Sequence, residues 1–593
     1  MTRKNTHNKI DEESIQELKT AADELHELAK ELGLKPPKVN YWLVDYDEIN
    51  QLAAYDGFPV RYPHWRWGMK YSKRNKEDTY FGGKIFELVN HDTPANAFNQ
   101  ISNSIDDHKG VIAHVEAHAD FFANNYFFED NPDATGMMER HANLIQSYYD
   151  NTDIDKNEVE EWIDSVLCIQ DMIDPLNGFK DIKNNDAEEQ SINEVLDSLD
   201  VSDEVKRQLT SDISDEKSET QNVIYEKDLL KFLLENGHQY NSDTERAEEY
   251  EHWQKSIIEI IRRESYYFSA QKMTKVMNEG WASIWESIMM ANEAYAQTDE
   301  IINYADKQSA VLNSPGFNPY KIGKELWEYI ENKENRREVV SKLLRVEGIT
   351  WRNFHEKIDF TQLNKLIYDN HDEDIPYERN YSLLRNQNKG FIKNISKDEL
   401  QKESRYIFDK NVYNTVEDAI KDIDYEKAWK KMREIRETHN DITFIDSFLT
   451  EEFVQDEQYF AYEYNHKARQ MQVSSTSLDA VKKKILLQIT NGGKPTIIAA
   501  DNNYNNAGEL LLKHQYNGVQ LNISKAIDVL KRLFKLWGKP VHLKTIRKNK
   551  NTGEEEGLLI SYDGTRTKRK EIKIIEDIQA DQIDYDTKPD DWL

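Results

Sequence analysis

Two histidines four positions apart, His114 and His118, are the residues in this sequence best suited to hold a metal ion. They lie in GVIAHVEAHADFFANNYFF, residues 110–128, whose apolar spacing predicts a helix. On a helix, side chains at i and i+4 are only ~40° apart around the axis, so both imidazoles project from one face. Because imidazole is a common zinc ligand, the pair predicts two ligands of one metal site.

The other polar residues of this segment fall on different faces of the predicted helix. Asn125 lies near the face of the histidines, whereas Glu116, Asp120 and Asn124 point elsewhere. Asp120 could still serve by orienting an imidazole or as a general base. A plainer interpretation is that two such histidines are only polar residues of a helix surface. The surrounding Val, Ile and Phe residues favour burial instead, and buried polar groups need partners.

Glu279, in the segment NEGWASIW at 278–285, is our candidate for a third ligand. Glycine is unfavourable within a helix, so Gly280 predicts either the close approach of another helix or a turn. Together with His114 and His118, a carboxylate from this segment would complete a His, His, Glu set with water as the open ligand, as in catalytic zinc sites.

The residues around Glu279 include candidates that would support a metal site, but they also allow an interpretation without a metal. Asn278 and Trp281 are the expected supporting residues, as is Asn125 on the histidine helix. Ser283 and Glu286 share a helical face with Glu279, so the alternative is a solvated acidic stripe without a metal. The tryptophans and methionines around them leave little polar surface for such a stripe.

Composition excludes several classes of function. The chain has 593 residues and a net charge of -32, which repels nucleic acid and anionic membranes at long range. Its single cysteine, Cys168, excludes an internal disulfide and a cluster of thiolate ligands. No apolar run has the length of a membrane span and the start lacks a secretory signal, so we expect a soluble cytoplasmic protein.

The predicted fold class is mainly α, with a large helical N-terminal domain followed by a smaller C-terminal α+β domain. The helical domain carries both motifs, and the segments before and after the insertion share one core. The expected divisions are a helical part with short strands at 1–180, an acidic exposed insertion at 181–222, a helical part at 223–473, the α+β domain at 474–576 and an acidic tail at 577–593.

Three predictions about local structure can be checked directly. Residues 12–33 have the spacing of an amphipathic helix that ends at Gly33. The stretch from Pro36 to about Pro94 mixes aromatics with turn residues, as in RYPHWRWGMKY at 61–71, and is expected to form short strands or loops packed on helices. In the C-terminal domain we expect strands at 496–501, 508–516, 541–547 and 557–563, and helices at 480–489 and 523–538.

The motifs also resemble those of the SpoVR (stage V sporulation protein R) family. The chain has HVEAHADFFANN and NEGWASIW, where the family pattern is a His-x-x-x-His helix continuing into Phe-Phe-x-Asn-Asn and, much later, Asn-Glu-Gly-Trp-Ala. Further matching segments, which extend the resemblance over most of the chain, are RYPHWRWG, FELVNHDTP, NPYKIGKELW, DSFLTEEF, GELLLKHQY and LFKLWGKPVHL.

The resemblance implies a cytoplasmic protein connected with spore cortex formation or with stress and stationary phase. It also implies as partners a PrkA-type serine protein kinase and a YeaH/YhbH-type protein. The chain departs from many members at position 286, where Glu286 stands in place of a histidine. A glutamate can bind a hard cation but does not replace imidazole in proton transfer without a changed pKa.

Our leading hypothesis from the sequence is a zinc-dependent hydrolase that resembles His-x-x-x-His plus Glu peptidases. In HExxH enzymes the general base directly follows the first histidine, but here that position is Val115. Glu286, Glu264, Glu87 or Asp120 would have to take this role.

Two other hypotheses come from different classes. One is a non-enzymatic adaptor or regulator that acts with the kinase, its His/Glu/Asn cluster serving as a structural core. The other is a di-metal carboxylate bundle using Glu264, Glu279, Glu286 and the two histidines. That bundle would need Glu-x-x-His pairs, which the sequence lacks.

Overall fold

The fold is known from a computed structural model, which describes residues 11–81, 87–128, 133–175, 226–292, 295–296, 300–313, 316–369, 392–424, 426–465, 469–549 and 554–573. The insertion and the tail expected at 181–222 and 577–593 lie outside these residues. The chain divides into two compact units that each combine distant segments. The first comprises Met1–Arg61, Trp65–Met137 and Met273–Leu486, and the second Tyr62–His64, Met138–Lys272 and Leu487–Leu593.

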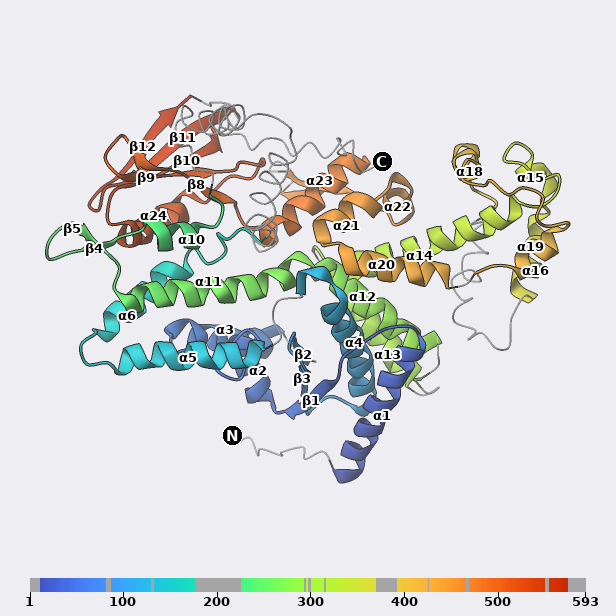
Figure 1. The fold of residues 1–593 in the computed structure, drawn as a ribbon, viewed down its shortest axis with the longest axis horizontal. Helices are drawn as coiled ribbons and strands as arrows, with labels where there is room; N and C mark the ends of the chain where they lie inside the picture. Colours follow the sequence, from blue (N-terminus) through green and yellow to red (C-terminus); the bar gives the residue numbers. More distant parts are fainter. Residues whose placement is uncertain are drawn as a thin grey trace, which may run out of the picture. The chain divides into compact units, whose positions relative to one another are not determined.

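Three helices form the centre of the first unit, namely α4 (Ile105–Asn124), α12 (Lys275–Ser287) and α14 (Pro319–Leu343). Helix α12 packs against both of the others, so segments far apart in sequence lie side by side (Figure 1). Helix α4 is buried at every residue from His108 to Phe122. A helix buried all round is a core helix, which explains why its apolar residues are not confined to one face.

Side chains from outside the central helices fix where these helices begin. Ser104 and Asp107 form a capping box at the start of α4. Helix α12 has no cap from its own N-terminal residue, and instead the buried Asp441 carboxylate accepts from the N–H groups of Val276 and Met277 at 2.8 and 2.9 Å. This carboxylate therefore satisfies donors that would otherwise be unpaired at a helix start.

Two glycines let α12 and α14 come into backbone contact. A Cβ atom on Gly280 would lie 2.3 Å from the carbonyl carbon of Gly323, and one on Gly323 would lie 2.2 Å from the carbonyl oxygen of Val276. Such distances are impossible for a real side chain, so neither position accepts a larger residue without separating the helices. Of the two alternatives predicted for Gly280, a close helix approach and a turn, the close approach is confirmed.

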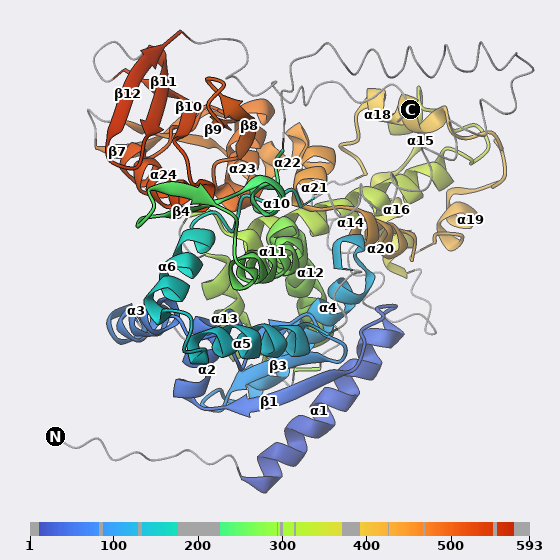
Figure 2. The same ribbon diagram turned by 60° about the vertical axis from the view of Figure 1, so that its left-hand side comes forward.

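A small three-stranded sheet covers one side of α4. Its strands are β1 (Val39–Val44), β2 (Glu87–Asn90) and β3 (Ala95–Gln100) in the order β1-β3-β2, with β1 parallel and β2 antiparallel to β3 (Figure 2). Ala97 packs against Val111 and Val115 of α4, which seals the sheet onto the helix.

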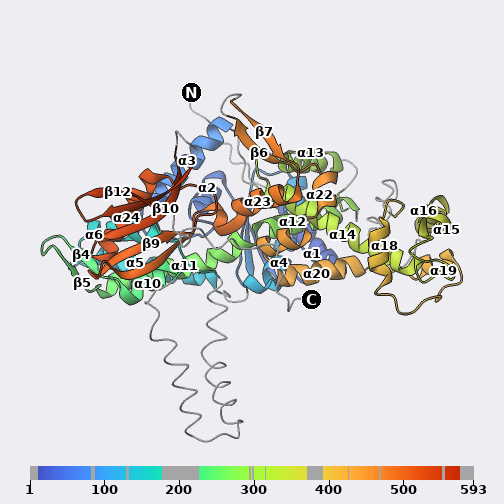
Figure 3. The same ribbon diagram turned by 90° about the horizontal axis from the view of Figure 1, so that it is seen from above.

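Further helices and strands complete the first unit. The predicted helix at 12–33 is confirmed as α1 (Glu12–Glu31). The strands or loops predicted between Pro36 and Pro94 are confirmed at β1 and β2, whereas residues 65–71 belong to the helix α3 (Trp65–Phe81), so the prediction was wrong there. Short helices gather around the C-terminal end of α14 (Figure 3). The remaining elements are α2 (Tyr46–Ala54), η1 (Tyr126–Phe128), η2 (Ile288–Asn292), α13 (Ile301–Leu312), α15 (Phe354–Lys357), α16 (Phe360–Asp369), α18 (Lys397–Ser404), α19 (Val416–Lys421), α20 (Lys427–Thr438), α21 (Asp441–Phe448), α22 (Glu451–Asp456), β6 (Ala461–Asn465), β7 (Gln470–Ser475) and α23 (Leu478–Ile489).

The second unit contains the C-terminal sheet, in the strand order β12-β11-β10-β9-β8. The four predicted strands and the helix predicted at 523–538 are present in this unit, and the helix predicted at 480–489 is α23 of the first unit. Together with the helical remainder, they confirm a mainly α fold with a smaller α+β part. One outer strand, β12, was not predicted. The elements of this unit are α5 (Ala134–Asp150), α6 (Lys156–Leu167), α10 (Leu229–Asn236), β4 (Gln239–Asn241), β5 (Arg246–Glu248), α11 (His252–Met273), η3 (Thr490–Gly493), β8 (Ile497–Tyr504), β9 (Glu509–His514), α24 (Ile523–Trp537), β10 (Val541–Lys548), β11 (Glu555–Tyr562) and β12 (Thr567–Ile572).

Among the helices in the described part of the chain, none combines the length and the apolar character that crossing a bilayer requires.

The close helix crossing predicts a large effect of one added methyl group. Gly280→Ala should destabilise the protein by about 1–3 kcal/mol or more, because the new Cβ overlaps the backbone of Gly323. Gly68→Ala is the matched control, since Gly68 lies within α3 and a Cβ there meets nothing within 4 Å. Urea denaturation should show the control unchanged or slightly stabilised, as alanine favours a helix. Equal stability of the two variants would contradict the crossing.

Buried His514 predicts acid sensitivity of the C-terminal sheet. Burial lowers its pKa from 6.5 to about 4, so the stability it contributes is present above pH 6.5 and is lost as the pH falls toward 4. Between pH 7 and pH 5 the loss should be about 2 kcal/mol. His514→Gln should therefore lose less stability over this range than the parent in urea denaturation. Substituting the exposed His252 in the same way should change nothing.

Candidate metal centre

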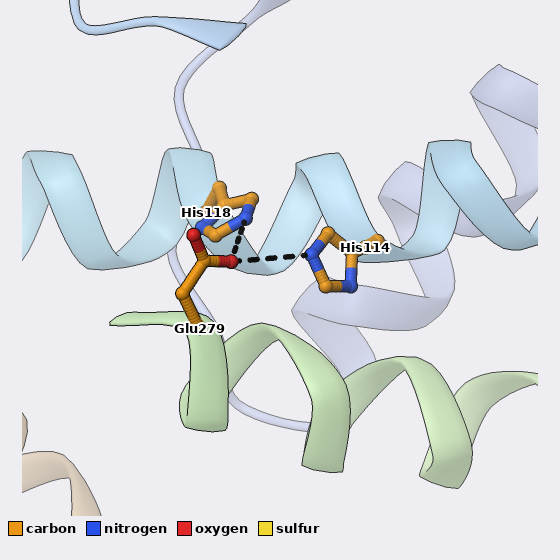
Figure 4. A group of neighbouring side chains, drawn as sticks. All are labelled: His114, His118 and Glu279. Carbon is orange, nitrogen blue, oxygen red and sulfur yellow. Dashed lines mark ion pairs between the residues drawn. The ribbon is translucent and has the colours of Figure 1, made fainter. Parts of the chain in front are cut away.

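Helix α4 presents His114 and His118 side by side toward α12, as their spacing predicts. Their ring centroids are 4.6 Å apart and both side chains are buried, with 7% and 6% exposed. Figure 4 shows the carboxylate of Glu279, which comes from α12, with His118 next to it and His114 to its right. The structure thus brings together the three residues that we named as metal ligands.

The spacing of the three side chains suits one metal ion. The Oε2 atom of Glu279 lies 3.5 Å from Nε2 of His118 and 3.9 Å from Nε2 of His114, and ligand atoms of all three residues lie within 4.8 Å of one another. Tetrahedral zinc with bonds of roughly 2.1 Å separates its ligand atoms by about 3.4 Å. Small side-chain movements would therefore close the set around an ion.

Hydrogen bonds on the opposite ring nitrogens orient both imidazoles. Nδ1 of His118 lies 2.8 Å from the amide oxygen of Asn278, and Nδ1 of His114 lies 2.8 Å from Oε2 of Glu286. Since both partners are acceptors, each Nδ1 carries the proton and each Nε2 faces Glu279. This is how carboxylates and amides orient metal-binding histidines in known sites. Gln308 donates to the other oxygen of Glu286 at 2.6 Å, which fixes this carboxylate as well.

The charges of this group are strongly coupled. Burial opposes protonation of His114, but the Glu279 and Glu286 carboxylates outweigh it and raise its pKa to about 10. Burial also favours neutral Glu279, but His114 and His118 hold the pKa of this carboxyl well below its usual range. Without a metal, a proton on His114 therefore balances part of the buried negative charge.

Two further residues contribute to the site. Glu87, the first residue of β2, interacts electrostatically with both histidines and both glutamates, and burial raises its pKa above the ordinary value. Tyr320, at the start of α14, stacks on the His114 ring with centroids 6.3 Å apart. The charge of Glu279, followed by burial, raises the pKa of the Tyr320 hydroxyl far above its usual value. Glu87 was among our candidate bases, but Tyr320 was not recognised, although it lies in the motif NPYKIGKELW.

Asp120, which we considered as a catalytic residue, has a different environment. Its carboxylate accepts from Arg436 at 2.6 Å, from the Trp281 indole at 2.9 Å and from the backbone N–H of Lys35 at 2.7 Å. Oδ1 thus forms a buried ion pair with Arg436 of α20, and Oδ2 accepts from Trp281 of α12, so both oxygens are engaged. Trp281 supports α4 through this contact rather than through a histidine.

The other candidates are also placed by their contacts. Asn125 donates to the backbone carbonyls of Arg436 and His439, so it holds the end of α20 instead of the histidines. Glu264 belongs to the second unit, where it lies 3.1 Å from Nδ1 of His141. It is not part of the group formed by His114, His118 and Glu279.

Family models match nearly the whole chain. The model described as SpoVR like protein matches residues 12–406 and 402–494, and the SpoVR-like C-terminal domain matches 495–548. The chain belongs to the SpoVR family. Both the histidine helix and the NEGWA helix lie within the first matched region, so the candidate metal centre of this SpoVR protein is built from segments that the family model covers.

One curated relative is an Escherichia coli (strain K12) protein named uncharacterized protein YcgB. It is 28% identical to the SpoVR chain over 304 residues, which cover 46% of this chain and 56% of the relative. The chain thus spans little more than half of the relative's length. No solved structure matches.

The geometry predicts stoichiometric metal binding that depends on the orienting carboxylate. His118→Ala should abolish binding of one Zn²⁺ per chain, and Glu286→Ala should weaken it by about 10–100-fold, because Glu286 orients His114 without being a ligand. Titration against a chromophoric chelator measures both affinities. Glu347→Ala, at an exposed acid in the same unit, is the matched control and should bind like the parent. Unaltered affinity in His118→Ala would contradict the assignment.

Proposed function

We propose that this SpoVR protein is a divalent-metal-dependent hydrolase, with His114, His118 and Glu279 as ligands and zinc as the metal. The convergence of the three ligand atoms within 4.8 Å is the observation that carries the proposal. Three protein ligands leave one position for water or substrate, which distinguishes catalytic from structural zinc sites. Zinc, when bound in such a set, activates water and polarises a carbonyl.

Glu87 is the residue that we propose as the general base. Its carboxyl interacts with the histidines and the ligand glutamate, and its raised pKa suits a group that must take up and release a proton. Glu286 is a weaker candidate, because one of its oxygens faces Nδ1 of His114 and the other accepts from Gln308. We therefore give Glu286 the role of a positioning residue.

Tyr320 would complete the chemistry as a hydrogen-bond donor. A tyrosine hydroxyl is protonated at neutral pH, and the Glu279 carboxylate and burial raise the pKa of Tyr320 further. A protonated hydroxyl in a buried site can stabilise negative charge that develops on a substrate oxygen. In this proposal, β2 provides the general base, α14 provides the hydrogen-bond donor, and α4 and α12 provide the metal ligands.

The family resemblance adds a biological setting to this proposal. It favours a cytoplasmic role in spore cortex formation or stress response, together with a PrkA-type serine protein kinase and a YeaH/YhbH-type protein. A non-enzymatic adaptor of this kinase, with the metal as a structural element, is the competing hypothesis. The two hypotheses differ in whether a metal-loaded protein turns over any substrate.

A base variant that keeps its metal separates the two hypotheses. Glu87→Gln should retain one metal per chain by plasma mass spectrometry, while turnover falls by about 10²–10⁴-fold, as for loss of a general base. Turnover is followed with a panel of fluorogenic peptide, ester and phosphodiester substrates. A chelator should abolish the parent's activity, and added Zn²⁺ should restore it. Glu347→Gln serves as the control.

Two outcomes would contradict parts of this proposal. If the parent protein carries one metal per chain but turns over no class of substrate, the metal has a structural role and the adaptor hypothesis is favoured. Equal turnover by Glu87→Gln and the parent would instead remove Glu87 from the mechanism while leaving the metal centre in place.

A further inference from the structure

Strand β1 has one side without a strand partner. It pairs with β3 along its other side only, and no further strand of the described chain joins it. The carbonyl of Lys38 accepts from the N–H of Ala95, and that of Val44 accepts from Ile101, so both point toward β3. Because peptide groups in a parallel strand alternate in direction, every second residue between them also faces β3.

The backbone N–H and C=O groups of the intervening residues of β1 therefore point away from β3, toward the free edge. These residues are Val39, Tyr41 and Leu43, whose N–H and C=O groups form a row of donors and acceptors at the edge. The strand sequence VNYWLV has no charged residue and no proline. Natural edge strands usually carry such residues to prevent pairing with another chain, and their absence here favours pairing.

A cavity of about 560 Å³ runs along this edge. Six consecutive residues, 38–43, line it. Because the side chains of a strand alternate between faces, contact with all six places part of the cavity at the strand edge. Asn99 of β3 and Ile112 of α4 line its inner side. The cavity is also lined by residues of α1 at helical spacing, namely Ile15, Leu18, Ala22 and His26. The two elements α1 and β1 can be followed in Figure 2.

A buried polar network fixes the floor of this groove. Glu116 of α4 is 1% exposed and points away from the metal centre. Its carboxylate accepts from the hydroxyl of Tyr41 at 2.7 Å and lies 2.8 Å from Nδ1 of His26. The hydrogen bond to Glu116 raises the pKa of His26 above its ordinary value. The network ties α1 and β1 to α4 and keeps the groove walls apart.

The rim of the groove is apolar and carries a local excess of positive charge. Ile15 and Trp42 are 48% and 53% exposed there. Two exposed lysines, Lys19 and Lys38, line the groove, together with one exposed acid, Asp23. The positive charge of the lysines is opposite in sign to the chain's net charge of -32. A segment with acidic and apolar side chains is complementary to this rim.

We propose that the groove between α1 and β1 binds an extended acidic segment of a partner protein, which adds to β1 as a further strand. Main-chain hydrogen bonds from Val39, Tyr41 and Leu43 supply affinity, as in other proteins that recognise peptides by strand addition. Lys19 and Lys38 select acidic side chains. This site lies on the face of α4 opposite to the histidines and does not depend on the hydrolase proposal.

Synthetic peptides test the proposal directly. The probe is a fluorescein-labelled hexapeptide of alternating Asp and Val, compared with its Lys/Val counterpart by fluorescence anisotropy on the full chain. The acidic peptide should bind about tenfold more tightly or better, and an analogue with N-methylated alternate amides should not bind, because it cannot pair with the strand edge.

Protein variants provide the matched control. The double variant Lys19→Glu and Lys38→Glu should reverse the preference between the two peptides. Lys30→Glu with Lys365→Glu, at exposed lysines outside the groove, should preserve it. Both variants should keep the parent's melting temperature and zinc content. These two measurements distinguish a loss of peptide binding from a loss of the fold.

Three results would overturn the proposal. They are equal binding of the two peptides, undiminished binding of the N-methylated analogue, and no peptide binding by a protein that instead dimerises in sedimentation. The last result would assign the edge to a second copy of this chain.

Discussion

The burial of α4 is the constraint on which the first unit depends. Since this helix is enclosed on all sides, each of its polar side chains must find a partner on a neighbouring element. His114 and His118 meet the carboxylates and amide of α12, Glu116 meets α1 and β1, and Asp120 meets α20. Four polar positions on one helix thus specify the placement of the surrounding elements, while its apolar residues only require that something cover them.

Much of this arrangement could be predicted because the relevant signals are local. The spacing of His114 and His118 fixes a common helix face, whatever the rest of the chain does. Gly280 in an otherwise helical segment signals a close approach, and the structure gives its partner as Gly323. The alternating strands and amphipathic helix of the C-terminal part are equally local patterns, and they are present where expected.

The features that were missed depend on contacts between distant segments. Nothing near Tyr320 or Asp441 indicates that one lies on a histidine ring and the other caps α12. The same limit explains why the environments of Asp120 and Glu264 were not predicted, since Arg436 and His141, with which they pair, lie more than a hundred positions away in the sequence. Strand β12, TKRKEI, was missed because it is an exposed outer strand rich in lysine and arginine and lacks an apolar face.

Charge balance is the strongest physical reason to expect a cation at the centre. Glu279 and Glu286 are both held beside His114 in a poorly solvated interior, and uncompensated buried carboxylates are costly. In the metal-free state a proton on His114 compensates one of them, which is why its pKa rises to about 10. A divalent cation would replace this proton and balance both carboxylates at once. The second carboxylate, Glu286, therefore favours a doubly charged ion over an apolar or merely hydrogen-bonded core.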